Sequence, residues 1–234
     1  MIDADARVAK IHKTGYWRVN IRPTRFAGKL IPLLSDCWRI VETSKVVLRG
    51  WDYPHVDEEE KANGQDWIQS GIDWQEYGHV ELWRLHQSGQ FVHHLACTED
   101  YHELPWSSSE GKPERYLLYV SALYILTEIF EFASRLATKE VLLPAAYVSI
   151  TLGNMARREL SYWHFNESLF HHRGYVSEID EIKLEDTYSP ETLLARSPEL
   201  ALEAALHLYE RFGWMNAPRQ WLAERQRMLL ERRL

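Results

Sequence analysis

Four residues between positions 52 and 94 have the side chains needed for metal or acid–base chemistry. They are Asp52, His55, Glu81 and His94. Carboxylates and imidazoles that converge can hold a divalent ion or exchange a proton with a substrate. The sequence therefore predicts a candidate catalytic site at these residues, with Glu81 and His94 as candidate metal ligands. A divalent metal is the one cofactor that they could hold, and no other is predicted.

A predicted β-hairpin places two of these residues. Strand-like runs flank Ser88-Gly89, a two-residue loop that suits a primed turn. Counting outward from this loop pairs Glu81 with Ala96 and puts Glu81 and His94 on one face as diagonal neighbours. Acids and histidines on a sheet face also pair with one another or with solvent, so a structural role is the competing interpretation. Apolar residues on both faces predict that the hairpin lies in a sheet covered on two sides.

The sequence lacks the motifs of several well-known enzyme classes. It contains no GxxxxGK(S/T), GxGxxG, GxSxG or HExxH string. These absences argue against a P-loop nucleotide enzyme, a Rossmann oxidoreductase, an α/β-hydrolase and a zincin. They leave open a metal-dependent hydrolase or nuclease, because carboxylate clusters leave weaker sequence traces.

Two further groups of polar residues are weaker candidates. Asp100, His102 and Glu103 follow the predicted hairpin, and His171 and His172 are adjacent in the second half of the chain. Acids in loops are generally solvated, and adjacent histidines on a regular element point in different directions. Neither group is therefore favoured as a site.

Charge is segregated along the chain, although the whole has a net charge of -7. Residues 1–50 carry ten Lys/Arg and four Asp/Glu, whereas residues 51–114 carry three and fourteen. The acidic total disfavours nucleic-acid binding through phosphate neutralisation, but it leaves room for a local basic patch.

Four arginines are the candidate contacts for an acidic partner or a nucleic acid. Arg18 and Arg22 belong to the basic first segment, and Arg225 and Arg232 lie near the C-terminus. Nearby Trp and Tyr rings would stack on bases if RNA or DNA were bound. The competing interpretation is that these arginines complement helix dipoles and aid solubility.

Hydrophobic periodicity predicts an α+β fold with a mixed, mostly antiparallel sheet, a long buried helix and a helical C-terminal region. In residues 15–23, Trp17, Val19 and Ile21 alternate with polar residues, which is typical of a half-buried strand. Strands are also predicted over 45–50, 67–74, 147–152, 158–163 and 179–184, and helices over 31–41, 114–139, 198–213 and from 218 onward. We expect one domain over 1–234, with a sheet-rich lobe 1–113 and a helix-rich lobe 114–234 as the only natural division.

The string Ser-Pro-Glu occurs at 189–191 and again at 197–199. A capping serine, a proline in the first turn and an acid near the positive end of the dipole are typical of a helix start. Both strings therefore predict helix N-termini.

Composition favours a soluble, cytoplasmic protein without a membrane partner. Cys37 and Cys97 are too few for a disulfide framework, and neither lies in a CxxC motif. The most apolar stretch, 117–137, carries three charged residues and is interpreted as a core helix. The first residues do not show the pattern of a signal peptide.

Two strings resemble bacterial proteins that have no established activity. They are RGWDYPH at 49–55 and WRLHQSGQF at 83–91. The resemblance covers the chain up to about residue 100. It implies a bacterial origin and one compact unit over 45–95, and it implies no catalytic residue.

Taken together, these patterns favour a non-catalytic binding or accessory subunit of a bacterial intracellular assembly, with a regulatory or defence role. Its partner would be another protein or a second copy of the chain, because aromatic content and segregated charge suit such contacts. Two other functions compete with this one. The first is a metal-dependent hydrolase or nuclease that uses the His/carboxylate cluster. The second is a nucleic-acid-binding protein that uses the basic first strand and the last helix.

Overall fold

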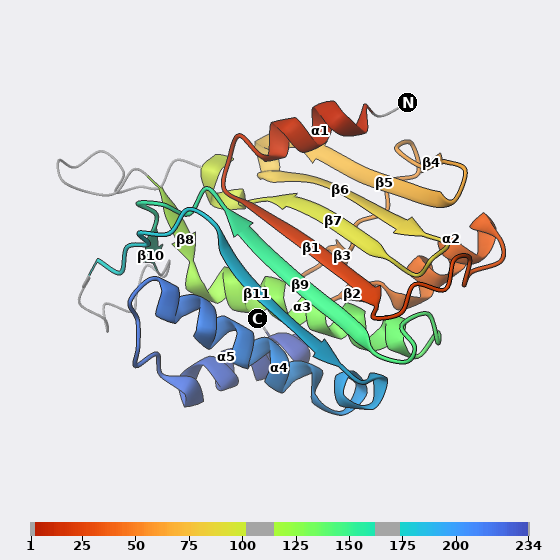
Figure 1. Ribbon diagram of the computed structural model, residues 1–234. Helices are drawn as coiled ribbons and strands as arrows, with labels where there is room; N and C mark the ends of the chain where they lie inside the picture. The colour runs from red at the N-terminus through yellow and green to blue at the C-terminus, as the bar shows by residue number, and fades with distance from the viewer. Residues whose placement is uncertain (1–2, 102–114, 162–173, 234) are drawn as a thin grey trace.

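A seven-stranded sheet forms the centre of the protein. The computed structural model describes residues 3–101, 115–161 and 174–233 (Figure 1). All neighbouring strands of this sheet are antiparallel. Their order is β11 (Ile182–Tyr188), β9 (Ala146–Gly153), β1 (Tyr16–Pro23), β7 (Phe91–Ala96), β6 (His79–His86), β5 (Trp67–Trp74) and β4 (Ala62–Asn63). The predicted α+β class with a mostly antiparallel sheet is confirmed.

β1 lies in the middle of the sheet and shows the predicted alternation. Trp17, Val19 and Ile21 are buried in the core. Arg18 and Arg22 point to the opposite face, where their side chains are half-buried. We call the first face the helix-covered face and the second the open face.

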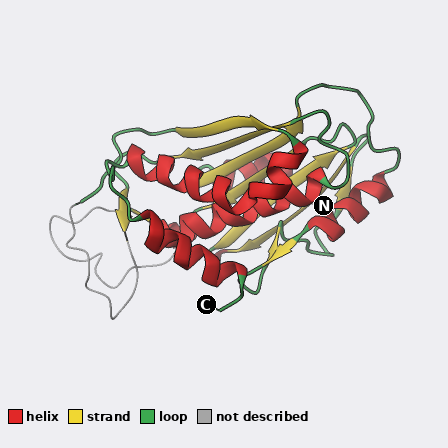
Figure 2. Ribbon diagram, turned by 90° about the horizontal axis from the view of Figure 1, so that it is seen from below, coloured by secondary structure: helices red, strands yellow, loops and turns green. Residues whose placement is uncertain are grey.

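Helices α2 (Leu34–Ser44), α3 (Tyr119–Ala137), α4 (Pro190–Arg211) and α5 (Arg219–Leu230) form a layer on the helix-covered face (Figure 2). α3 is buried around most of its circumference, as its apolar sequence predicts. α4 and α5 pack against α3, and α2 packs between α3 and the strands β5 and β6. The core therefore lies between the sheet and these helices.

α3 begins later than predicted. The segment Tyr116–Leu118 forms a short strand, β8, which pairs in parallel with β10 (Glu159–Ser161). An extended segment that has a strand partner satisfies its backbone groups without becoming helical. The predicted strand over 45–50 is similarly reduced to β2 (Val46–Val47), which pairs with β3 (Asp52–Tyr53).

The two Ser-Pro-Glu strings lie in one helix. Ser189 caps α4, with its hydroxyl accepting the Thr192 N–H. The second string follows Arg196, whose φ of -133° interrupts the helical geometry. Pro198 lacks a backbone N–H, so it can begin a new turn but cannot continue an old one. The second predicted N-terminus is therefore a kink within α4.

One helix, α1 (Ala4–Ile11), lies on the open face and was not predicted. Asp3 caps it by accepting the Ala6 N–H at 3.0 Å. Its Ile11 packs with Val80, Leu82 and Ala96 in a small second core. α1 contacts β6 and β7 and covers one end of the open face (Figure 1).

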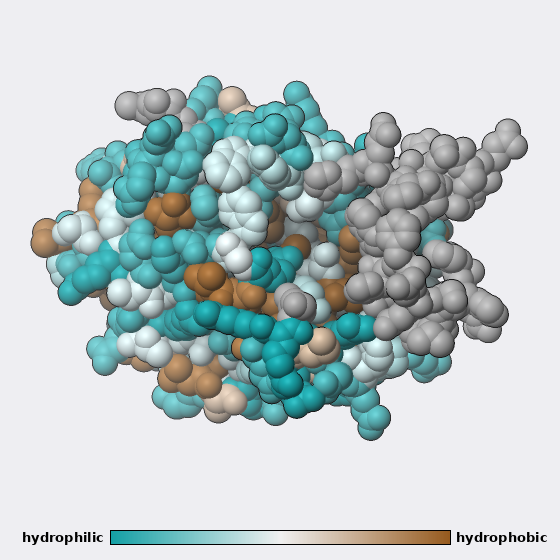
Figure 3. Space-filling view, turned by 180° about the vertical axis from the view of Figure 1, so that it is seen from behind, coloured by the Kyte–Doolittle hydropathy of each residue, from teal (hydrophilic) through white to brown (hydrophobic). Residues whose placement is uncertain are grey.

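None of the described helices is long and apolar enough to cross a membrane. Seen from behind, hydrophilic side chains predominate and the apolar ones form separate patches (Figure 3).

The loop between β6 and β7 is one residue longer than predicted. His86 N–H donates to the Gln90 carbonyl at 2.8 Å, and Gly89 N–H donates to the His86 carbonyl at 2.9 Å. Gly89 has a φ of +85°. A β-turn followed by a left-handed glycine is the usual geometry of a three-residue hairpin loop.

The longer loop changes the pairing register. Glu81 lies opposite Leu95, and Leu82 lies opposite His94. Because side chains alternate between faces, a shift of one residue moves every side chain of a strand to the other face. The predicted placement of Glu81 and His94 on one face is therefore wrong.

The left-handed position makes a test of the hairpin loop. Gly89→Ala is expected to lower the free energy of unfolding by about 1–3 kcal/mol, because a side chain is strained at positive φ and a Cβ there would meet the Val141 carbonyl oxygen. Urea unfolding followed by fluorescence measures it. Gly28→Ala is the control for the positive φ alone, because nothing crowds its Cβ position. Equal losses in the two variants would contradict a crowded loop.

Candidate functional site

Glu81 projects from β6 into the core side of the sheet, where its side chain is 2% exposed. Its Oε1 accepts the His55 backbone N–H at 2.7 Å, and its Oε2 lies 3.2 Å from His79 Nε2 and 3.3 Å from His93 Nε2. Burial raises the pKa of the Glu81 carboxyl, but the two imidazoles outweigh burial and hold that pKa well below its usual range. Glu81 is therefore an ionised carboxylate inside the protein.

The structure brings three of the four predicted catalytic residues together and separates the fourth. Asp52 and Glu81 line one cavity, and His55 is bonded to Glu81 through its backbone. His94 lies on the open face, with its Nδ1 3.1 Å from His12 Nε2. Burial, together with the charges of His12 and other basic neighbours, lowers the pKa of His94 to about 3. Glu81 and His94 therefore cannot share a metal ion.

The surroundings of Glu81 and Asp52 bear on the candidate metal chemistry. Within the ranges that the structure describes, no group of three or more His, Cys, Asp or Glu side chains could hold a metal ion. Both oxygens of Glu81 already face hydrogen-bond donors. Asp52 is instead 2.8 Å from Lys45 Nζ.

Sequence reasoning missed the two imidazoles beside Glu81. His79 precedes Glu81 by two residues on the same strand, so alternation along β6 was an available signal for it. His93 faces the core because of the corrected register, and its Nδ1 lies 3.2 Å from the Tyr53 hydroxyl. Only the true loop length would have identified His93 instead of His94.

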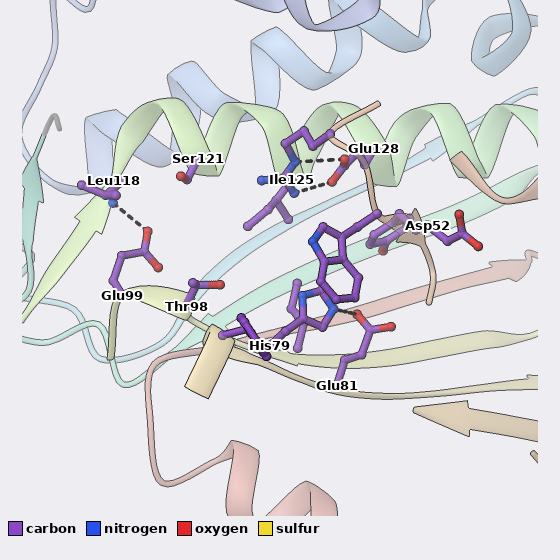
Figure 4. A pocket seen from close by; sticks show the side chains of 14 residues that line it. Asp52, His79, Glu81, Thr98, Glu99, Leu118, Ser121, Ile125 and Glu128 are labelled. Carbon is purple, nitrogen blue, oxygen red and sulfur yellow. Dashed lines mark hydrogen bonds and ion pairs between the residues drawn. The ribbon is translucent and has the colours of Figure 1, made fainter. Parts of the chain in front are cut away.

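A cavity of about 340 Å³ lies beside Glu81, between α3 and the sheet (Figure 4). His79 and Glu81 reach it from β6. Ser121, Ile125 and Glu128 reach it from α3 on the opposite side. The cavity is thus built by both layers of the fold, although its residues are far apart in sequence.

Among the described residues that line this cavity, four carry a carboxylate and one is an arginine. The carboxylates belong to Asp52, Glu81, Glu99 and Glu128, and the arginine is Arg49. Arg49 donates from Nε and Nη2 to both oxygens of Glu128, at 3.0 and 2.5 Å. Asp52 is paired with Lys45, and Glu81 faces two imidazoles. Glu99 is therefore the lining carboxylate without an ion pair among the described residues.

Glu99 differs from the other three carboxylates. It accepts the Leu118 backbone N–H at 3.0 Å (Figure 4). Among the described residues no Lys, Arg or His forms an ion pair with it. Burial raises the pKa of the Glu99 carboxyl, and its own backbone, that of Leu118 and the charge of Arg158 oppose the shift only in part. A cation placed in the cavity would therefore stabilise the ionised form of Glu99.

Aromatic rings form the wall beside His79. The Trp51 ring stacks on His79 with centroids 4.8 Å apart, and Trp74 meets Trp51 edge-on at 5.5 Å. Tyr77 also lines the cavity and is 62% exposed. Aromatic faces attract cations through their quadrupole, so this wall and the carboxylates favour the same kind of ligand.

The secondary candidates have separate outcomes. Asp100 is a buried structural group, not a solvated loop acid as predicted, because its oxygens accept Arg158 Nη1 and Nη2 at 2.7 and 2.8 Å. The predicted groups at His102, Glu103 and at 171–172 lie outside the described residues.

The four predicted contact arginines do not form one surface. Arg18 and Arg22 lie on the open face. Arg225 lies on α5, where it stacks over the Trp221 ring at 4.8 Å, and Arg232 follows the end of α5 and is exposed. The helix layer and the open face are on opposite sides of the sheet, so the first and last pairs cannot contact a single small partner.

Comparisons of the chain with protein-family models, curated proteins and solved structures found no match. The function must therefore be inferred from the geometry of the cavity and of the sheet.

Proposed function

We propose that the protein is a binding protein whose cavity holds a small organic cation. The observation that carries this proposal is Glu99, a half-buried residue whose carboxylate lines the cavity, accepts the Leu118 N–H at 3.0 Å and forms no ion pair among the described residues. Its pKa is raised. The described cation that acts on Glu99, Arg158, is already paired with Asp100, so bound positive charge would give Glu99 a counter-ion of its own. The volume of about 340 Å³ is near the lower end of small-molecule sites. Trp51 and Tyr77 would contact the ligand through their rings.

Binding is better supported than catalysis. Glu81 and Glu128 are held by fixed donors, so neither is free to take a proton from a substrate without losing its own contacts. Burial raises the pKa of the Cys97 thiol, which argues against a nucleophilic thiolate. A metal-dependent hydrolase or nuclease loses its support with the separation of Glu81 from His94.

We also propose an accessory role in the cytoplasm of a bacterium, in contact with a protein partner or a second copy. Support comes from the resemblance at 49–55 and 83–91 and from the buried free thiols Cys37 and Cys97, which suit a reducing compartment. Native mass spectrometry of the protein purified gently from its host tests this role. A mass equal to one bare chain would contradict it.

Cation binding is expected to depend on pH. At low pH Glu99 is protonated, and a bound cation must displace that proton. Affinity should therefore be full above the raised pKa of Glu99 and should fall as pH decreases through it. Calorimetric titration with choline, agmatine and putrescine at several pH values measures this. The neutral isostere of choline, in which carbon replaces nitrogen, should bind weakly at every pH.

Glu99→Gln tests the same site without changing its shape. The amide oxygen can still accept the Leu118 N–H, but the negative charge is lost. We expect cation affinity to fall about tenfold or more, since a charge-assisted contact is worth roughly 1.5–3 kcal/mol. Glu210→Gln, an exposed change on α4, is the matched control. If none of the cations bound, or if Glu99→Gln bound them as tightly as the parent, the cavity proposal would be overturned.

A further inference from the structure

The open face of the sheet is a second surface with a distinct character. α1 covers one end of it, where Tyr101 of the short 3-10 helix Thr98–Tyr101 also packs. In Figure 1 this face is toward the viewer, and the helix layer lies behind it. Its side chains come from β11, β9, β1, β7, β6 and β5, so it is a broad surface and not a groove between two elements.

Three arginines on the open face lack a carboxylate partner within the described part of the chain. Arg18 Nη2 lies 3.4 Å from Thr151 Oγ1, and Arg22 Nη1 lies 3.4 Å from a backbone carbonyl. Arg84 donates to Gln69 Oε1 at 3.2 and 2.6 Å. The guanidinium groups elsewhere in this acidic protein commonly pair with Asp or Glu. Unpaired arginines gathered on one face therefore indicate an anionic partner that lies outside the chain.

Two histidines on this face have lowered pKa values, for which burial is the largest cause and basic neighbours are a smaller one. Burial lowers the pKa of His12, and the charge of Arg18 lowers it further. Burial and the neighbouring basic groups lower the pKa of His94. Burial lowers the pKa of Arg84, and the charges of Asp5 and Asp66 oppose this shift without forming an ion pair with Arg84.

Two more acids lie on this face: Glu185 of β11 accepts the Tyr147 hydroxyl at 2.7 Å, and Asp73 of β5 is paired with Lys10 of α1. The arginines on β1 and β6 lie between these acids and make that part of the open face basic.

Two of the arginines stack on aromatic rings. The Arg22 guanidinium lies 4.6 Å from the centre of the Tyr147 ring, and Arg84 lies 4.1 Å from the centre of the Trp67 ring. Trp67 and Tyr147 belong to β5 and β9, which are separated by four strand-to-strand steps, or about 19 Å. A chain that crosses the sheet at right angles to the strands would meet both stacks. Proteins that bind single-stranded nucleic acids combine basic side chains for the backbone with aromatic rings on which the bases stack.

A hollow next to α1 adds to this surface. It has a volume of about 440 Å³. Its walls include the apolar side chains of Val8, Leu82 and Val92, and its polar lining residues include Asp5, Arg84 and His94. A hollow with both apolar and hydrogen-bonding side chains in its lining suits a base that is turned out of a strand. An acidic peptide would have no comparable use for it.

We propose that the open face binds single-stranded nucleic acid, with Arg18, Arg22 and Arg84 on the phosphates and the Trp67 and Tyr147 stacks on the bases. This site lies on the other side of the sheet from the cavity and does not depend on it. A flat sheet cannot enter a groove of a duplex as a helix or ribbon does, so single strands are the ligand.

The test uses the whole chain and a labelled oligothymidylate as the probe. Fluorescence anisotropy measures Kd at several salt concentrations for the parent and for Arg18→Gln/Arg22→Gln/Arg84→Gln. We expect the triple variant to bind at least tenfold more weakly. The slope of log K against log salt should fall by about 2, since each phosphate contact on a single strand contributes roughly 0.7.

Two controls distinguish a nucleic-acid site from a site for an acidic protein and from a general effect of charge. Arg39→Gln/Arg211→Gln/Arg219→Gln removes the same charge from α2, α4 and α5 and should leave Kd unchanged. Trp67→Leu removes a ring without changing charge and should weaken oligothymidylate binding about tenfold. Equal losses in the two triple variants would overturn the proposal. A second result would also overturn it: polyglutamate competes as effectively as unlabelled oligonucleotide, and Trp67→Leu has no effect. The surface would then be a site for an acidic protein.

Discussion

Replacing Glu81 by alanine is expected to lower the free energy of unfolding by roughly 3–5 kcal/mol, the size usual for breaking a buried charged contact. The change leaves the His55 N–H without its acceptor at 2.7 Å. It also leaves the imidazoles of His79 and His93 without the carboxylate that faces both of them. Denaturant unfolding followed by circular dichroism measures the loss.

Glu81→Gln separates charge from shape in this experiment. The amide keeps one oxygen for the His55 N–H, but it removes the negative charge between the imidazoles. An intermediate loss is expected, smaller than that of Glu81→Ala. Glu210→Ala, on the exposed side of α4, should change the free energy by less than about 0.5 kcal/mol. A loss at Glu81→Ala no larger than at Glu210→Ala would contradict a structural role for the buried carboxylate.

The same carboxylate gives stability a defined pH dependence. Its pKa in the folded protein is lower than the ordinary value of 4.5. Its contribution is therefore fully present above the unfolded-state pKa and is lost as pH falls toward the folded-state pKa. The stability of the parent should decline below about pH 4.5 more steeply than that of Glu81→Gln.

The strands that alternate or lie near turns were predictable because their signals are local. β5 has the predicted bounds, and β1 begins one residue after the predicted start, since burial of every second side chain is written in the order of residues. The register of β6 and β7 was not predictable to one residue. The Ser88-Gly89 pair suits a two-residue loop, but the chain places Gly89 alone in the left-handed region. That difference decides which of two adjacent histidines, His93 or His94, faces Glu81.

The cavity was less predictable than the strands because its residues are distant in sequence. Arg49, in the loop before β3, forms an ion pair with Glu128 on α3. No rule of helix or strand spacing relates two residues so far apart in the sequence. Glu99 meets the backbone of Leu118 in the same way. The helix α1 was missed because it is short and only Ile11 in it is buried, so it shows little hydrophobic periodicity. Its partner surface on β6 and β7 depends on the register of the hairpin, which local signals do not determine.

Arg158 and Asp100 form a second buried charged contact whose removal should have a large effect. Arg158 is fully buried, and it donates to both oxygens of Asp100 and to the Tyr116 carbonyl. Asp100 also accepts the Gly15 N–H at 2.6 Å. The pair thus ties together the segments before β1, after β7, at β8 and after β9. These segments have no common hydrophobic pattern, which is why the sequence did not reveal the contact.

Arg158→Met is expected to lower the free energy of unfolding by about 3–5 kcal/mol, because it leaves the Asp100 carboxylate buried without its counter-ion. Adding Asp100→Asn to this variant should restore part of the loss, since the amide carries no charge and can still accept the Gly15 N–H. Urea unfolding of the parent, both single variants and the double variant gives the coupling energy between the two residues. If the loss in free energy of unfolding of the double variant equals the sum of the two single losses, the coupling energy is zero. Arg158 would then stabilise the fold through packing and its carbonyl contact alone.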